Sequence, residues 1–153
     1  RLIARAMRTP YIHLEGYMNR WWLIPYNRFG IAVRIHEILR SDADRDLHDH
    51  PWWYVTIILR GGYWERTEDY GWPIERWHGP GSVLFRRASH FHKLQLHGDL
   101  RHCWTLFITG PKRKDHVPEH SCWGFLVEGE KVPADVYLGD RYIATDYTKG
   151  GNR

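Results

Sequence analysis

Two histidines in the middle of the chain have the residue type and spacing of metal ligands. His48 and His50 are separated by one residue, and His92 lies further along the chain. On a β-strand, residues two apart point to the same face, so the first two imidazoles would lie side by side while Asp49 points away. Imidazole is the commonest metal ligand in proteins. The spacing therefore predicts a site where these imidazoles can converge on one ion.

The same alternation places further side chains on the face of the two histidines. Trp52 and Thr56 would line the pocket beside the ion, and Tyr54 would lie between them. The phenol of Tyr54 could bind the ion weakly, donate a hydrogen bond to a substrate or to dioxygen, or pack as an ordinary core aromatic. We name Tyr54 as the candidate catalytic residue and leave the three roles open.

These positions resemble the two motifs of the cupin superfamily, G(X)5HxH(X)3–4E(X)6G and G(X)5PxG(X)2H(X)3N. His48, His50 and Gly61 fit the first motif, and Gly81 and His92 fit the second. The resemblance covers residues 42–96 by motif and about 30–130 by strand layout. The chain is also similar to small cupin-like proteins of phages and bacteria, through the stretches "DLHDHPW", "ILRGGY" and "WTLFITGPK".

The chain departs from both motifs at several positions. Asp42 stands in place of the opening glycine and Tyr54 in place of the glutamate of the first motif. In the second, Arg87 and Ser89 replace the proline and glycine, and Leu96 replaces the asparagine. The carboxylate ligand of the motif is therefore lost, and a face of three histidines remains.

The resemblance implies one divalent transition metal held by His48, His50 and His92, with His90 as the alternative to His92. Three protein ligands leave open positions on the ion for water, substrate or dioxygen, as in catalytic metal sites. Imidazoles suit several metals, so zinc, nickel and manganese remain alternatives. Fe(II) is favoured because oxygen chemistry is expected. Without a carboxylate ligand the site keeps more positive charge, which favours an anionic ligand.

Three functions stay open at this level. The favoured one is a metal-dependent cupin, a non-haem Fe(II) dioxygenase or other oxidoreductase that acts on a small anionic substrate. The second is a non-catalytic metal- or ligand-binding cupin, such as a sensor or a phage accessory protein. The third is an enzyme similar to the sugar-nucleotide epimerases and isomerases, which share the fold and work without bound metal. A fold alone does not decide between them.

Two more groups of candidates lie outside the motifs. Arg34 and His36 share one face of a predicted strand and could enter the pocket, with Arg34 binding a substrate carboxylate, but an exposed strand face is favoured. The loop residues His116, His120 and Cys122 form a cluster without the paired spacing of a zinc site, so a solvated loop is favoured there. Cys103, on a strongly apolar strand, is expected to be a core residue.

Short strands separated by Gly and Pro turns predict an all-β fold, a single-domain cupin or jelly-roll antiparallel β-barrel. Residues 1–29 would form an N-terminal helical or extended arm packed outside, residues 30–130 the barrel core, and residues 131–153 a C-terminal strand and tail. Gly61 and Gly62 would supply a turn between strands. The length of 153 residues suits one domain.

Composition indicates which classes of binding partner are expected and where the protein would be located. The formal net charge is +4, but no groove-reading motif accompanies the basic residues, so nucleic-acid binding is not expected. The chain contains no long apolar run, which argues against a membrane segment. Two cysteines fit a reducing compartment, the cytoplasm of a bacterium or of a phage-infected host cell. A small-molecule ligand is expected, and the aromatics Trp21, Trp22 and Tyr26 could form a homodimer contact.

Overall fold

The computed structural model describes residues 2–11, 13–25, 27–98, 102–112 and 119–141. Strands dominate these residues. In chain order the elements are α1 (Leu2–Ala6), β1 (Met18–Ile24), β2 (Ala32–Ile38), β3 (Leu47–His48), β4 (Tyr54–Arg60), β5 (Tyr63–Asp69), β6 (Trp72–His78), β7 (Val83–Arg86), β8 (Lys93–Leu96), β9 (Cys103–Thr109), β10 (Gly124–Val127), β11 (Glu130–Pro133) and α2 (Ala134–Leu138), followed by a single 3-10 turn, η1 (Gly139–Arg141).

The largest sheet has five strands in the order β1-β2-β9-β4-β7, and every neighbouring pair is antiparallel. Alternate residues of β9 are buried, from Cys103 to Thr109, as expected for a strand with one face on the core. The buried core residue Cys103 agrees with the expectation from the sequence. This sheet lies beneath the histidine cluster.

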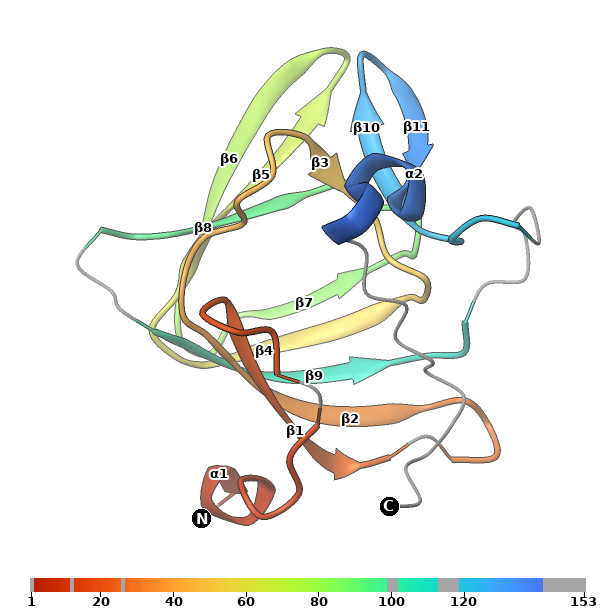
Figure 1. The fold of residues 1–153 in the computed structure, drawn as a ribbon. Helices are drawn as coiled ribbons and strands as arrows, with labels where there is room; N and C mark the ends of the chain where they lie inside the picture. The colour runs from red at the N-terminus through yellow and green to blue at the C-terminus, as the bar shows by residue number, and fades with distance from the viewer. Residues whose placement is uncertain (1, 12, 26, 99–101, 113–118, 142–153) are drawn as a thin grey trace.

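Two three-stranded sheets, β11-β10-β3 and β6-β5-β8, complete the fold. Figure 1 shows β5, β6, β10 and β11 on one side of the molecule and β2, β4 and β9 on the other. The two smaller sheets meet where His48 and His92 form an isolated bridge, with each backbone N–H 2.9 Å from the other residue's carbonyl oxygen. The bridge brings two predicted metal ligands into direct backbone contact.

Strand β2 is buried on both faces. On the outer side of the sheet, Ile35 packs with Trp21 of the neighbouring strand β1 and with Ala6 of α1. Arg34 and His36 point to the opposite face and are also buried. The expectation that these two residues lie on an exposed strand face is therefore wrong. Polar–apolar alternation indicates that two faces differ, but it does not say which one meets solvent when a further layer covers the sheet.

A mostly β fold with antiparallel sheets is confirmed, and two details of the prediction need correction. The N-terminal arm does contain a helix, but β1 belongs to the five-stranded sheet instead of packing outside it. The predicted turn is present at Gly61, whose φ is +77°, and it connects β4 with β5, which lie in different sheets. After β11 the chain forms the short helix α2, which the pattern did not predict.

The N-terminal aromatics contribute to the packing within the chain. Trp21 is buried and stacks on Trp104 of β9, with ring centroids 5.5 Å apart. It is therefore not available for the predicted dimer contact, whereas Trp22 is half-buried and Tyr26 lies outside the described residues. Within the part of the chain that the structure describes, none of the helices has the length and apolar character that crossing a membrane requires.

Candidate metal centre

The segment that carries His48 and His50 differs from the continuous strand that we predicted. Strand β3 ends at His48 and β4 begins only at Tyr54, so His50 lies in the connection between two sheets. The backbone N–H of His50 donates to the carbonyl of Ala88 at 3.1 Å, which holds the connection beside the segment that leads to His92. The side chains still converge, because this hydrogen bond and the His48–His92 bridge bring the two segments together.

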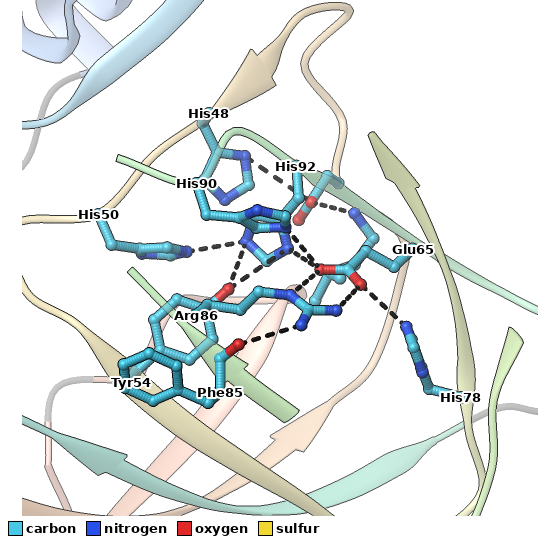
Figure 2. Close-up of polar contacts among 11 residues, drawn as sticks. His48, His50, Tyr54, Glu65, His78, Phe85, Arg86, His90 and His92 are labelled. Carbon is cyan, nitrogen blue, oxygen red and sulfur yellow. Dashed lines mark hydrogen bonds and ion pairs between the residues drawn. The ribbon is translucent and has the colours of Figure 1, made fainter. Parts of the chain in front are cut away.

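The three predicted ligands form one compact group. The Nε2 atoms of His50 and His92 lie 2.9 Å apart, and one ring nitrogen of each of His48, His50 and His92 lies within 4.8 Å of the others. Figure 2 shows the three rings gathered around a common centre. Two imidazole nitrogens at about 2.1 Å from one ion and at right angles to each other would be roughly 3.0 Å apart. The distance between His50 and His92 fits two neighbouring ligands of a single ion.

Burial keeps the imidazoles of His50 and His92 neutral. It lowers the pKa of His50 well below its ordinary value, and the nearby His92 and His48 lower it further. Burial also lowers the pKa of His92, although hydrogen bonding to Glu65 opposes this shift. A neutral imidazole offers a lone pair to a metal, while a protonated one does not. Both of these imidazoles can therefore offer a lone pair to a cation near neutral pH.

Tyr54 lies against the same group. Its hydroxyl oxygen is 3.1 Å from Nε2 of His92, and its ring stacks on Phe107 with centroids 4.9 Å apart. Burial raises the pKa of the Tyr54 phenol well above its ordinary value, so the group stays protonated. The residue both packs in the core and presents a hydrogen-bond donor to the site.

A carboxylate that the sequence patterns did not indicate lies behind His92. Oε1 of Glu65 is 3.0 Å from Nδ1 of His92 and 3.3 Å from Nε2 of His90. Arg86 donates to Oε1 from Nε at 3.0 Å and to Oε2 from Nη2, while Nε2 of His78 is 2.9 Å from Oε2. Burial alone would raise the pKa of Glu65, but the hydrogen bonds from His90, His92 and Arg86 outweigh it and hold the pKa far below its usual range.

His90, the alternative ligand, lies on the Glu65 side of the cluster. Its ring nitrogen joins Glu65 and His92 in a second group whose ligand atoms lie within 4.8 Å of one another. His92 is common to both groups. Among the described residues these are the only two groups of three such side chains with metal-like spacing. This chain has Tyr54 where the motif has a glutamate, and a carboxylate, Glu65, lies nearby on β5.

A weak sequence signal for Glu65 existed. In the stretch "GYWE" (Gly62–Glu65), Tyr63 and Glu65 lie two residues apart on β5, and both are 3% exposed, while Trp64 between them is 37% exposed. An acidic residue on the inward face of a strand needs a partner, since an isolated buried charge is costly. That partner could not be identified from spacing, because Arg86, His78 and His92 come from other segments.

The predicted substrate-binding residues lie deeper in the core. Trp52 stacks on His50 with ring centroids 5.5 Å apart, and the guanidinium of Arg34 lies 5.2 Å from the Trp52 ring. Nη2 of Arg34 donates to the hydroxyl of Thr109 at 3.1 Å. Thr56 and His36 are buried on the same interior. Trp52 therefore separates Arg34 from the histidine cluster.

Other residues considered from the sequence lie outside the centre. Asp49 is 1% exposed and accepts hydrogen bonds from the backbone N–H of Gly124 and from Nζ of Lys131, both at 2.7 Å, so it connects β10 and β11 to the loop. Nδ1 of His120 lies 2.9 Å from the carboxylate of Asp135, and Cys122 is buried. His116 lies outside the described residues.

The protein surface has a depression beside the cluster. Its lining residues are Phe85, Arg86, Arg87, Ser89 and His90. Arg86 and His90 belong both to this depression and to the contacts of Glu65. The depression therefore lies next to the cluster and is lined by two arginine side chains.

Comparison with known proteins gives structural likenesses. No family model and no curated protein matches the sequence. The structure resembles a crystal structure of Fe(II) HppE (TM-score 0.51, 14% identity, 61% of this chain and 50% of that one). It also resembles the polyketide cyclase RemF from Streptomyces resistomycificus (0.52, 17%, 69% and 79%) and a protein of unknown function with a cupin-like fold from Ralstonia eutropha (0.50, 16%, 78% and 67%).

The likenesses extend over different shares of these proteins. The chain spans half the length of the HppE chain, and identities of 14–17% establish the fold alone. The antiparallel sheets, the two motifs and the neighbours agree with one another. This chain has the fold of the cupin superfamily.

Proposed function

We propose that the protein is a metal-dependent oxidoreductase that uses one Fe(II) ion and a small anionic substrate. The observation that carries the proposal is the separation of 2.9 Å between Nε2 of His50 and Nε2 of His92, with His48 completing the group. When bound, the ion would supply binding and activation of dioxygen or polarisation of the substrate. The structural neighbour HppE was crystallised in an Fe(II) form, so the fold accommodates that ion in another protein.

The charges of the site favour an anionic substrate. Three neutral imidazoles leave the full charge of a divalent ion uncompensated, whereas a carboxylate ligand would reduce it. Glu65 does not offset this charge, because Arg86 pairs with both of its oxygens. Arg87 lines the surface depression next to the cluster, whereas the charge of Arg86, which lines it too, is compensated by Glu65. A carboxylate, phosphonate or thiolate would therefore be attracted to this depression and to the ion beside it.

The remaining residues would orient the substrate. Tyr54 is protonated and buried beside His92, so its hydroxyl can donate a hydrogen bond to a substrate oxygen at the ion. The rings of Trp52 and Phe107 meet edge to face, with centroids 5.8 Å apart, and form an apolar wall of the site. Such a wall limits the water that reaches the reacting atoms.

Oxygen consumption tests the proposal. Untagged protein, loaded anaerobically with Fe(II), should consume dioxygen when a panel of small carboxylates, phosphonates and thiols is added, and His92→Ala should not. Saturable ligand binding without consumption or product would instead support a non-catalytic binding protein. Turnover of a sugar nucleotide by metal-free protein would support the epimerase-like alternative.

A further inference from the structure

We infer that Glu65 is a positioning residue: its carboxylate fixes the tautomer of His92 so that Nε2 carries the lone pair offered to the metal. The inference rests on the proposed metal function and adds a residue that the cupin motifs do not contain. It concerns a contact behind the ligand, on the side of the ring that faces away from His50.

The first step is the direction of the hydrogen bond. Oε1 of Glu65 lies 3.0 Å from Nδ1 of His92. Because the guanidinium of Arg86 donates to both oxygens of Glu65, the carboxylate acts as an acceptor toward His92, and Nδ1 carries the hydrogen. In a neutral imidazole the other nitrogen, Nε2, then keeps its lone pair. Nε2 is the atom that lies 2.9 Å from Nε2 of His50, while the Tyr54 hydroxyl is 3.1 Å from Nε2 and 3.4 Å from Nδ1. The tautomer set by Glu65 is therefore the one that the proposed ligand group requires.

The second step is the rigidity of the carboxylate. Arg86 contacts both oxygens, with Nε on Oε1 and Nη2 on Oε2, which fixes the plane of the group. On the other side, Nε2 of His78 lies 2.9 Å from Oε2. Figure 2 shows Glu65 enclosed between Arg86, His78 and the two histidines His90 and His92. Since the side chain is 3% exposed, solvent offers it little alternative hydrogen bonding. Carboxylate contacts of this kind orient ligating imidazoles and raise their basicity.

The competing interpretation makes Glu65 a ligand itself. Glu65, His90 and His92 have metal-like spacing. An ion there would have to displace the hydrogen on Nδ1 of His92. It would also lie close to the guanidinium of Arg86, which already contacts both carboxylate oxygens. Repulsion between the two cations disfavours this arrangement. A dinuclear site with His92 between two ions is the outcome that would overturn the positioning role.

Nuclear magnetic resonance of the metal-free protein tests the tautomer directly. Two-bond ¹H–¹⁵N correlations distinguish Nδ1–H from Nε2–H imidazoles, and His92→Gln identifies the signals. We expect the Nδ1–H form of His92 in the wild type and a mixture with the Nε2–H form in Glu65→Leu. Glu37→Leu is the matched control, since Glu37 contacts Nδ1 of another histidine, His102, at 2.7 Å and away from the centre. This control should leave the His92 signals unchanged.

Zn(II) titration supplies the second readout. Glu65→Leu should lower the affinity of the first equivalent about 10- to 100-fold, as expected for loss of a residue that orients a ligand. Glu37→Leu should not change it. Should Glu65→Leu fail to fold, the isosteric Glu65→Gln retains an oxygen acceptor, and we expect it to keep the Nδ1–H form while binding Zn(II) more weakly.

Two results would overturn the inference. One is an Nε2–H form of His92 in the metal-free wild type, a measurement that needs no Glu65 variant. The other is uptake of two Zn(II) ions per chain with loss of the Nδ1 hydrogen. If the wild type shows the Nδ1–H form but binds no metal, the tautomer assignment is upheld and the proposed function fails.

Discussion

The Nε2 atoms of His50 and His92 lie 2.9 Å apart although the residues are 42 positions apart in the sequence. His50 belongs to the connection between β3 and β4, and His92 immediately precedes β8. Their meeting depends on the bridge between His48 and His92, which joins the two smaller sheets. The candidate site is therefore a property of a junction between sheets, and changes on either side of the junction should affect it.

Variants of Tyr54 distinguish a catalytic site from a site that only binds a ligand. In the proposed enzyme, Tyr54→Phe should leave metal content unchanged and lower turnover about ten- to a thousand-fold, because the hydroxyl no longer donates to the substrate. Tyr54→Glu should keep or tighten metal binding and weaken the affinity for anions. Metal content and steady-state kinetics check both variants. If Tyr54→Phe loses the metal, the phenol is itself a ligand, and the account with three histidines is wrong.

Acid should destabilise the metal-free protein below neutral pH. Burial is the main cause that lowers the pKa of His36, His50 and His92 below their ordinary value near 6.5. Below that pH the unfolded chain binds protons that the folded chain resists, so stability falls as pH decreases, with a slope of about 1.4 kcal/mol per pH unit for each such imidazole. Urea unfolding between pH 7.5 and 5.5 measures this. The lowered pKa of Glu65 acts in the same direction, but at lower pH.

His36→Phe provides the control for that slope. His36 stacks on Phe107, with centroids 4.6 Å apart, so an aromatic replacement retains the ring contact and removes one titrating group. Its unfolding free energy should fall less steeply between pH 7 and 5.5. A slope equal to that of the wild type would mean that His36 does not contribute.

Asp49 should contribute to stability rather than to metal binding. It lies between two predicted ligands in sequence, but its carboxylate accepts from Gly124 and Lys131. Asp49→Ala would leave a buried backbone N–H without this acceptor and should lower the unfolding free energy by about 1–3 kcal/mol. Asp69→Ala, at an exposed strand end, should change it by less than about 0.5 kcal/mol. One metal per chain in the folded Asp49→Ala protein is expected, and a complete loss would assign Asp49 to the site.

Gly61 should tolerate no side chain. A Cβ there would clash with the carbonyl oxygen of His102, and the φ of +77° disfavours other residues. Gly61→Ala should therefore destabilise by about 2–4 kcal/mol, combining backbone strain with overpacking. Gly71 has a similar φ of +82° and open space around it, so Gly71→Ala should cost only about 1–2 kcal/mol. Thermal or urea unfolding compares the two, and equal costs would show that the close approach does not matter.

The spacing of the histidines was informative because the cupin motifs encode which segments meet. The positions of His48, His50 and His92 could be carried over one at a time, and the structure brings them together. Period-2 alternation assigned Tyr54 to the same group, although β3 and β4 are separate strands. The expected continuous strand was wrong, since alternation along a segment does not show where hydrogen bonding passes from one sheet to another.

Long-range contacts account for the residues that spacing could not find. Glu65 meets His92 from 27 positions away and on another strand, and no periodicity relates them. Likewise, Arg34 and His36 are buried on the inner face of β2 among Trp52, Thr109 and Phe107, and Ile35 is buried on the other face by Trp21 and Ala6, so both faces of β2 lie inside. A pattern within one segment shows only which residues share a face of that segment. Burial also depends on what packs against each face.

The metal content of untagged protein tests the central claim most directly. Elemental analysis and Fe(II) or Zn(II) titration should give one ion per wild-type chain and a strong loss in His48→Ala, because one imidazole of the group is removed. His120→Ala removes an exposed histidine that pairs with Asp135 and should retain full metal content. Equal metal content in the wild type and His48→Ala, or none in either, would contradict a metal centre formed by His48, His50 and His92.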